Sequence, residues 1–222
     1  MGDASLLAAE RVGSSGAVLG IERSAEAIAT AHRCAVAARQ NWVRFDLAEV
    51  AAFDAEGKFD AVIGRLVLMY IPDPAAALRR LCRHLRPGGV VAFQEMAMPL
   101  TRSNSEGHQF RQCVSWILGT FEHAGFESDM GSKLFATFLN AGLPAPEMIV
   151  TGRVEGGPDS PVYDWLAATL RSLLPLAERL GVVTAAEVEI DTLAERLRKE
   201  ALHHTACLMP PPLIGAWTRT QV

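Results

Sequence analysis

The 222-residue sequence predicts an α/β fold built on a doubly wound, mostly parallel sheet. Three observations favour this class. Short apolar runs alternate with helical patterns over the first hundred residues, a rhythm typical of right-handed βαβ units. Turn and cap residues such as Asp73-Pro74 and Pro87-Gly88-Gly89 separate these segments. Half of the residues are hydrophobic, which is enough for a full core.

The first elements follow in order from local patterns. Residues 5–10 predict a helix that stops near the glycines at positions 13 and 16. Residues 17–22 are an apolar run ending in Glu22, the pattern of a parallel strand buried on both faces. Ser24 is a good N-cap for a helix with apolar positions up to Ala38. Residues 42–46 and 59–64 predict two further strands.

Asp73 is a candidate cap for the next helix, with Pro74 in its first position. Residues 87–89 are expected to end this helix, and residues 90–95 form the following strand. Beyond Met98 the rhythm changes. Helices are expected over residues 108–124, 131–141, 161–180 and 184–202, and strands over residues 146–154 and near 213–218. The tail, residues 206–222, is expected at the edge of the sheet.

Composition narrows the function classes. The formal net charge of −4 and the absence of a Lys or Arg run disfavour nucleic acid and membrane surfaces, so we expect a small-molecule substrate. The four cysteines are far apart and form no CxxC, which disfavours a metal site. No apolar stretch reaches the roughly 20 residues of a membrane span, and the N-terminus lacks a signal pattern. We therefore expect a cytoplasmic protein.

Candidate site residues stand at the ends of the predicted strands. Glu22 lies 20 residues after Gly2, the offset between a glycine turn and the acid that accepts hydrogen bonds from ribose hydroxyls. Asp46 can accept from an adenine amino group while the backbone of Leu47 meets the ring edge. Arg65 can bind a carboxylate through two parallel hydrogen bonds. The alternatives are a strand-end cap for either acid and a salt bridge for the arginine.

Several segments, in this order, resemble the class I S-adenosylmethionine-dependent methyltransferases. They are GDASLLAA (2–9), VLGIERS (18–24), FDL (45–47), FDAVIGRLVLMY (59–70), PDP (72–74) and LRPGGV (85–90). Residues 2–98 look most like the small-molecule branch that contains the ubiquinone-biosynthesis type of domain. The resemblance implies a Rossmann-like sheet of seven strands, the last antiparallel, and S-adenosylmethionine as cofactor. It assigns cofactor binding to Gly2, Asp3, Glu22, Arg23, Asp46, Leu47, Gly64 and Arg65.

The sequence departs from this pattern at its start. The family's first strand, which precedes the glycine motif, has no counterpart, and only Gly2 and Asp3 match the end of that motif. We expect the sheet to lack this central strand, which leaves its two neighbours without ladder partners. Three explanations compete: a start set too far downstream, a natural fragment, or a chain that no longer uses the cofactor. We favour the first.

We expect one domain over residues 1–222, with a cofactor-binding core (1–98), a helical substrate lid and a strand (99–183), and a C-terminal helix and edge strand (184–222). The resemblance implies methyl transfer to a small molecule, impaired if the missing strand is essential. Glu95, His108 and His203 are candidate general bases, each with the alternative of a structural or surface role. The alternative function is an inactive, methyltransferase-like binding module. The acceptor, the atom methylated and the oligomeric state stay open.

Overall fold

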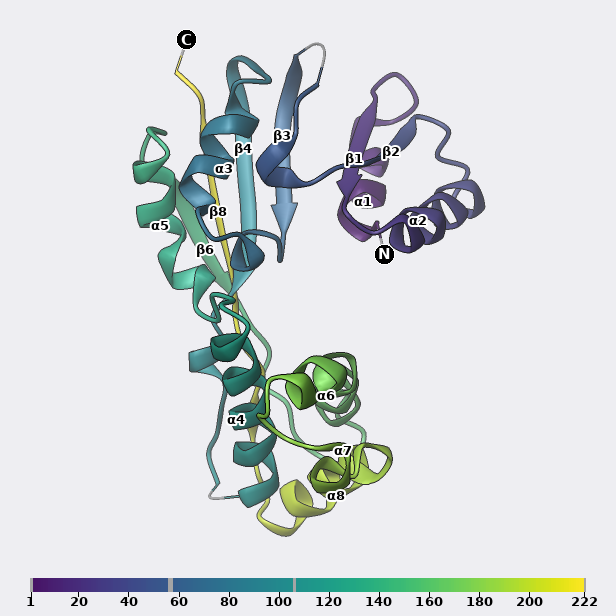
Figure 1. The fold of residues 1–222 in the computed structure, drawn as a ribbon, viewed down its shortest axis with the longest axis vertical. Helices are drawn as coiled ribbons and strands as arrows, with labels where there is room; N and C mark the ends of the chain where they lie inside the picture. Colours follow the sequence, from purple (N-terminus) through teal and green to yellow (C-terminus); the bar gives the residue numbers. More distant parts are fainter. Residues whose placement is uncertain (1, 56–57, 106, 222) are drawn as a thin grey trace.

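The computed structural model describes residues 2–55, 58–105 and 107–221 and shows an α/β fold, as the sequence predicts (Figure 1). Its strands lie in two main sheets, and a group of helices lies beyond the end of the larger sheet. None of the described helices is both long and apolar enough to cross a membrane.

The N-terminal unit holds the smaller sheet. It consists of α1 (Asp3–Val12), β1 (Val18–Glu22), α2 (Ala25–Ala37) and β2 (Val43–Leu47), and the two strands pair in parallel. Ser24 caps α2 as predicted, because its hydroxyl accepts a hydrogen bond from the Ala27 amide at 3.2 Å. The indole Nε1 of Trp42 donates to the Ala9 carbonyl at 2.9 Å, which ties α1 to the start of β2.

The larger sheet has the order β3-β4-β8-β6, formed by β3 (Phe59–Arg65), β4 (Leu85–Met96), β8 (Leu213–Arg219) and β6 (Glu147–Thr151). β3 and β4 are parallel, and β8 runs antiparallel to both of its neighbours. The helices α3 (Pro74–Cys82) and α5 (Met130–Asn140) cover one face of this sheet. Val91, Phe93 and Glu95 on β4 are buried there.

The two sheets are separate in the described part of the chain: β1 pairs only with β2, and β3 pairs only with β4. Figure 1 shows β3 and β1 facing each other across this division. α1 contacts both strands and bridges the two units. Ile63 on β3 is 49% exposed, although strands of parallel sheets are normally covered on both faces.

Four helices form a helical subdomain below the sheet in Figure 1: α4 (His108–His123), α6 (Val162–Arg179), α7 (Ala185–Val188) and α8 (Ile190–His203). Their apolar faces pack together around buried residues such as Ile117, Leu170 and Leu193. The short strands β5 (Arg102–Ser103) and β7 (Leu208–Met209) pair beside this subdomain. α5 is not part of it, because α5 packs on β4 and β8.

Three sequence predictions need correction. The helix expected over residues 184–202 is two helices, because Glu189 adopts left-handed backbone angles (φ 44°, ψ 56°) between α7 and α8. The guanidinium of Arg196 donates to the carbonyls of Val188 and Glu189 and so satisfies the end of α7.

The other two corrections concern strands. Residues 87–89 do not end α3, which stops at Cys82; they lie in an irregular start of β4, whose register with β3 shifts between Phe59 and Ala61. β8 is not an edge strand. It lies between β4 and β6, so that β6 forms the edge.

Candidate functional site

The acids at the ends of β1 and β2 lie on adjacent strands. In the parallel register Ile21 lies opposite Asp46 and Glu22 opposite Leu47. The carboxyl ends of parallel strands meet at one edge of a sheet, the usual place for a ligand in this fold. The structure therefore brings three of the predicted cofactor-binding residues together: Glu22, Asp46 and Leu47.

Glu22 caps the turn that follows its strand, which is one of the two roles that the sequence left as alternatives. Its Oε1 accepts hydrogen bonds from the amides of Arg23 at 2.8 Å and Ser24 at 3.1 Å, and so closes the turn into α2. Within the described residues, its Oε2 receives no hydrogen bond. One carboxylate oxygen therefore caps the turn and the other is available to a ligand.

A cavity of about 550 Å³ lies next to these strand ends. Asp46 and Leu47 form one side, and the segment around η1 (Val50–Ala52) forms the other. The 64% exposed Leu47 side chain and the buried Phe53 provide apolar surface, and the lining also contains three acids, Asp46, Glu49 and Asp54. An apolar wall beside several acceptors is suited to a flat ring that carries hydrogen-bond donors.

Gly2 and Asp3 stand at the N-terminus of α1. Gly2 has a left-handed backbone (φ 77°), and a Cβ there would lie 2.8 Å from Cβ of Ala31. Only glycine fits this position, because it needs both the positive φ and the close approach to α2. Asp3 occupies the first turn of α1.

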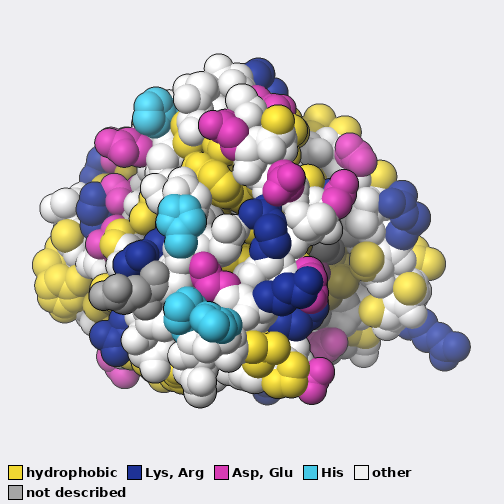
Figure 2. All heavy atoms as spheres, turned by 90° about the horizontal axis from the view of Figure 1, so that it is seen from below, with side chains coloured by type: hydrophobic (Ala, Val, Ile, Leu, Met, Phe, Trp, Pro, Cys, Tyr) yellow, Lys and Arg dark blue, Asp and Glu magenta, His cyan; other side chains and the backbone are white. Residues whose placement is uncertain are grey.

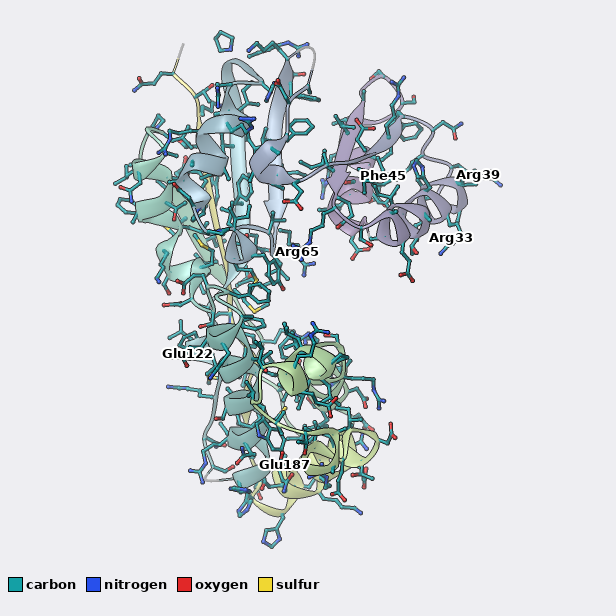
Figure 3. The ribbon with its side chains drawn as sticks, in the orientation of Figure 1. Arg33, Arg39, Phe45, Arg65, Glu122 and Glu187 are labelled. Carbon is teal, nitrogen blue, oxygen red and sulfur yellow. The ribbon has the colours of Figure 1, made fainter. Side chains whose placement is uncertain are left out.

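Gly64 and Arg65 end β3 on the side that faces the smaller sheet. A Cβ at Gly64 would lie 2.2 Å from the Phe93 ring, so glycine is needed for the packing of β3 on β4. Arg65 is exposed, and its Nε donates to Oε1 of Gln94 at 3.3 Å. Figure 3 shows Arg65 at the end of β3, between the two sheets. Its guanidinium is accessible to a ligand at this edge.

Arg23 follows Glu22 and is exposed. Burial raises the pKa of the Tyr70 hydroxyl, the negative charge of Glu95 raises it further and the positive charge of Arg23 lowers it; the net pKa is raised. The eight predicted cofactor-binding residues fall into two groups, one on each side of the division between the sheets.

The three candidate bases do not meet at this edge. Glu95 is fully buried and accepts hydrogen bonds from Val67 and Leu68 at 2.9 and 2.8 Å. His108 begins α4, a 16-residue helix about 24 Å long, whose other end contacts the sheet unit. His203 ends α8, next to the start of α4, where Glu200 accepts from the Gln109 amide.

The histidines at that end lie far from the strand ends. Figure 2 shows the lower face of the molecule, where histidine side chains lie among acidic and basic ones. The mixture of charges leaves no extended basic surface on this face, in keeping with the net charge of −4. The described residues also contain no group of three or more His, Cys, Asp or Glu side chains placed to hold a metal ion.

Sequence reasoning missed one residue at the edge, Tyr70. It ends η2 (Leu68–Tyr70), just after β3, and is 39% exposed. Its ring meets Phe126 edge-on, with centroids 5.0 Å apart, and Phe126 in turn meets Phe121 at 6.0 Å. The position directly after a predicted strand was the signal that could have identified it.

Of the aromatic residues in the predicted lid, Phe121, Phe138 and Tyr163 are buried in the core.

The comparisons with known proteins identify the family of the chain. Residues 1–135 match a family described as "Methyltransferase domain". An arsenite methyltransferase from Aquipseudomonas alcaligenes is 33% identical over 96 residues, which are 40% of this chain and 28% of that protein. A chloroplastic 2-phytyl-1,4-beta-naphthoquinone methyltransferase from Arabidopsis thaliana is 31% identical over 123 residues, 53% of this chain and 44% of that protein. The chain thus spans less than half the length of these relatives.

Solved structures share the fold. The [4+2]-cyclase SpnF has a TM-score of 0.54 at 19% identity, with all of this chain and 71% of the cyclase covered. Geranyl diphosphate methyltransferase, solved in complex with S-adenosylmethionine, has a TM-score of 0.53 at 14% identity, with 100% and 74% covered. The family match covers more than half of the chain. The chain therefore belongs to the methyltransferase-domain family, the S-adenosylmethionine-dependent class that its sequence motifs resemble.

Proposed function

We propose that this chain is the cofactor-binding part of an enzyme that transfers a methyl group from S-adenosylmethionine to a small molecule. The observation that carries the proposal is the placement of Glu22 and Asp46 at the ends of two adjacent parallel strands, beside the 550 Å³ cavity that Asp46 lines. Glu22 would hold the ribose hydroxyls through its unengaged Oε2, while Asp46 and Leu47 would hold the adenine. Arg65 and the N-terminus of α1 at Gly2 and Asp3 would face the methionine end.

When bound, S-adenosylmethionine supplies a methyl group on a positively charged sulfur. The residues of the chain would hold this group near an acceptor and exclude water, and such positioning gives most of the acceleration in a direct transfer. A general base is needed only if the acceptor must lose a proton. Glu95 is buried against backbone amides, and His108 and His203 lie at the far end of the helical subdomain. This arrangement favours an acceptor that needs no base from these residues.

The helical subdomain is proposed to roof the acceptor, with residues 1–98 as the cofactor-binding core. Two relatives have small-molecule names, an arsenite methyltransferase and a naphthoquinone methyltransferase. Tyr70 and Phe126 place aromatic surface between the sheet and the helices, which suits an apolar or aromatic acceptor. We expect the reaction to take place in the cytoplasm.

We further propose that a complete site includes one more parallel strand between β1 and β3. The support is the pair of facing strands, each with a partner on one side only among the described residues, and the half-exposed Ile63 between them. Buried backbone groups that lack partners cost about 1–3 kcal/mol each. An added strand would pair both edges and bring its own amides to the methionine end of the cofactor.

Calorimetry with S-adenosylmethionine tests both proposals. The chain and a form extended upstream by the residues encoded before Met1 are titrated side by side, and methyl transfer is followed by release of S-adenosylhomocysteine. We expect the extended form to bind more tightly. Equal micromolar binding by both forms would show that the strand is not needed. No binding by either form would refute the cofactor site and favour a binding module without methyl transfer.

A further inference from the structure

A fully buried acid at the end of β4 has no role in the site described so far. Glu95 lies on the face of β4 that α3 and α5 cover, and its side chain is 0% exposed. α5 begins directly against it, since a Cβ at Gly131 would lie 3.0 Å from the Glu95 carbonyl oxygen. A carboxylate in such a place is costly unless it accepts hydrogen bonds, so its partners indicate what the residue does.

The partners of Glu95 are the amides that follow β3. Oε1 accepts from Val67 at 2.9 Å and from Leu68 at 2.8 Å. The chain leaves β3 through Leu66, which has a left-handed backbone (φ 55°) although it is not glycine. The turn at Leu66 points the amides of Val67 and Leu68 into the core, where they have no strand partner. Glu95 is the acceptor that makes the turn possible in a buried place.

The same turn determines where Tyr70 stands. Leu68 and Met69 are 0% and 1% exposed and anchor the segment in the core, while Tyr70 emerges at the edge with its ring against Phe126. Burial raises the pKa of the Tyr70 hydroxyl, the negative charge of Glu95 raises it further and the positive charge of Arg23 lowers it.

We propose that Glu95 is a positioning residue: its carboxylate holds residues 66–70 so that the Tyr70 ring forms one wall of the place where the acceptor binds. This inference rests on the proposed function, because the wall matters only if the edge is a methyl-transfer site. The ring suits an acceptor with a flat or apolar surface. Oε2 of Glu95 has no hydrogen-bond partner among the described residues, so the two bonds to Oε1 carry the role.

The experiment uses the two tyrosines of the chain, Tyr70 and Tyr163. Labelling with 3-fluorotyrosine gives one fluorine signal for each, and Tyr163, buried in the helical subdomain, is the internal control. Hydrogen exchange is followed at the Val67 and Leu68 amides. The variants are Glu95→Ala, Glu95→Asp and Glu95→Gln, with Glu122→Ala on the exposed side of α4 as the matched control (Figure 3).

Glu95→Ala should speed exchange at Val67 and Leu68 about tenfold or more, which corresponds to a loss of about 1.4 kcal/mol, and should shift only the Tyr70 signal. Glu95→Gln keeps a carbonyl oxygen for both amides and should resemble the wild type, as should Glu122→Ala. If Glu95→Ala does not fold, Glu95→Asp decides, because its shorter side chain cannot reach both amides. Unchanged exchange and an unchanged Tyr70 signal would overturn the proposal.

A second arm links Tyr70 to the site. Addition of S-adenosylmethionine, to whichever form of the chain binds it in calorimetry, should shift the Tyr70 signal and leave that of Tyr163 in place. Glu95→Ala should weaken this binding, and Glu95→Gln should restore it. Binding without a shift at Tyr70 would refute the positioning role while the proposed function stands. If neither form binds, the proposed function fails and the positioning role fails with it, whatever the exchange data show.

Discussion

Replacement of Glu22 by glutamine separates its two roles. The amide carbonyl of Glu22→Gln can still accept from Arg23 and Ser24, so the turn into α2 should persist. The amide NH₂ that replaces Oε2 cannot accept from a ribose hydroxyl. A hydrogen bond to a charged group contributes about 1.5–3 kcal/mol, which corresponds to roughly 10- to 150-fold in affinity. We therefore expect a loss of S-adenosylmethionine affinity in this range with little change in stability.

Calorimetry and thermal unfolding measure the two effects on the same samples. Glu26→Gln is the matched control, since Glu26 is an exposed acid in the first turn of α2, one turn beyond the proposed site. Glu22→Ala should lose both affinity and stability, because it also removes the acceptor of the turn. If Glu22→Gln binds S-adenosylmethionine as tightly as the wild type, Glu22 does not hold the ribose and the reasoning from strand-end position fails.

Three further changes test the structure itself. Glu200 accepts from the amides of Gln109 and Phe110 at the start of α4; Glu200→Ala should cost about 1–2 kcal/mol and lower Tm by roughly 2–8 °C, and an unchanged Tm would refute this cap. Glu189→Gly should be more stable than Glu189→Ala by about 1 kcal/mol in urea unfolding, since glycine adopts the left-handed angles without strain; the reverse order would contradict the break between α7 and α8. Burial raises the pKa of Glu95 above its usual 4.5, against the hydrogen bonds from Val67 and Leu68 that lower it, so the folded state holds this proton more tightly. Stability should fall as pH rises from about 4.5 through the raised pKa, and Glu95→Gln should remove that fall; parallel pH profiles would show that Glu95 does not cause it.

Local patterns predicted most of the elements. Ser24 and Asp73 cap α2 and α3 through contacts within four residues, so a short window of sequence contains all the information. The acids at the ends of β1 and β2 were found for the same reason, because a strand end is visible in the hydrophobic pattern. The family's fold then followed from the order of these pieces.

Contacts between residues far apart in the sequence could not be predicted from local patterns. Glu95 lies 28 residues from Val67, and nothing in the apolar run before Glu95 shows that its carboxylate turns inward to the end of β3. The order of strands is equally hidden, since the pattern of β8 does not say that it lies between β4 and β6. Glu189 broke a regular helical pattern because Arg196, the seventh residue of α8, donates to the carbonyls at the break.

Backbone hydrogen bonds hold together the segments that connect the larger sheet to the helical subdomain. The segments that carry β5 and β7 pair with each other, and Glu155 exchanges two backbone hydrogen bonds with Leu208 on the second of them, each 2.8 Å long. Backbone hydrogen bonds thus join three segments that are far apart in sequence, those of β5, Glu155 and β7. The continuous helix α4 lies beside them. A hinge motion of the helical subdomain relative to the sheet would have to break these backbone hydrogen bonds. Under the proposed function, access for an acceptor would depend on the shape of this assembly and on small side-chain movements, so selectivity would be set before the acceptor binds.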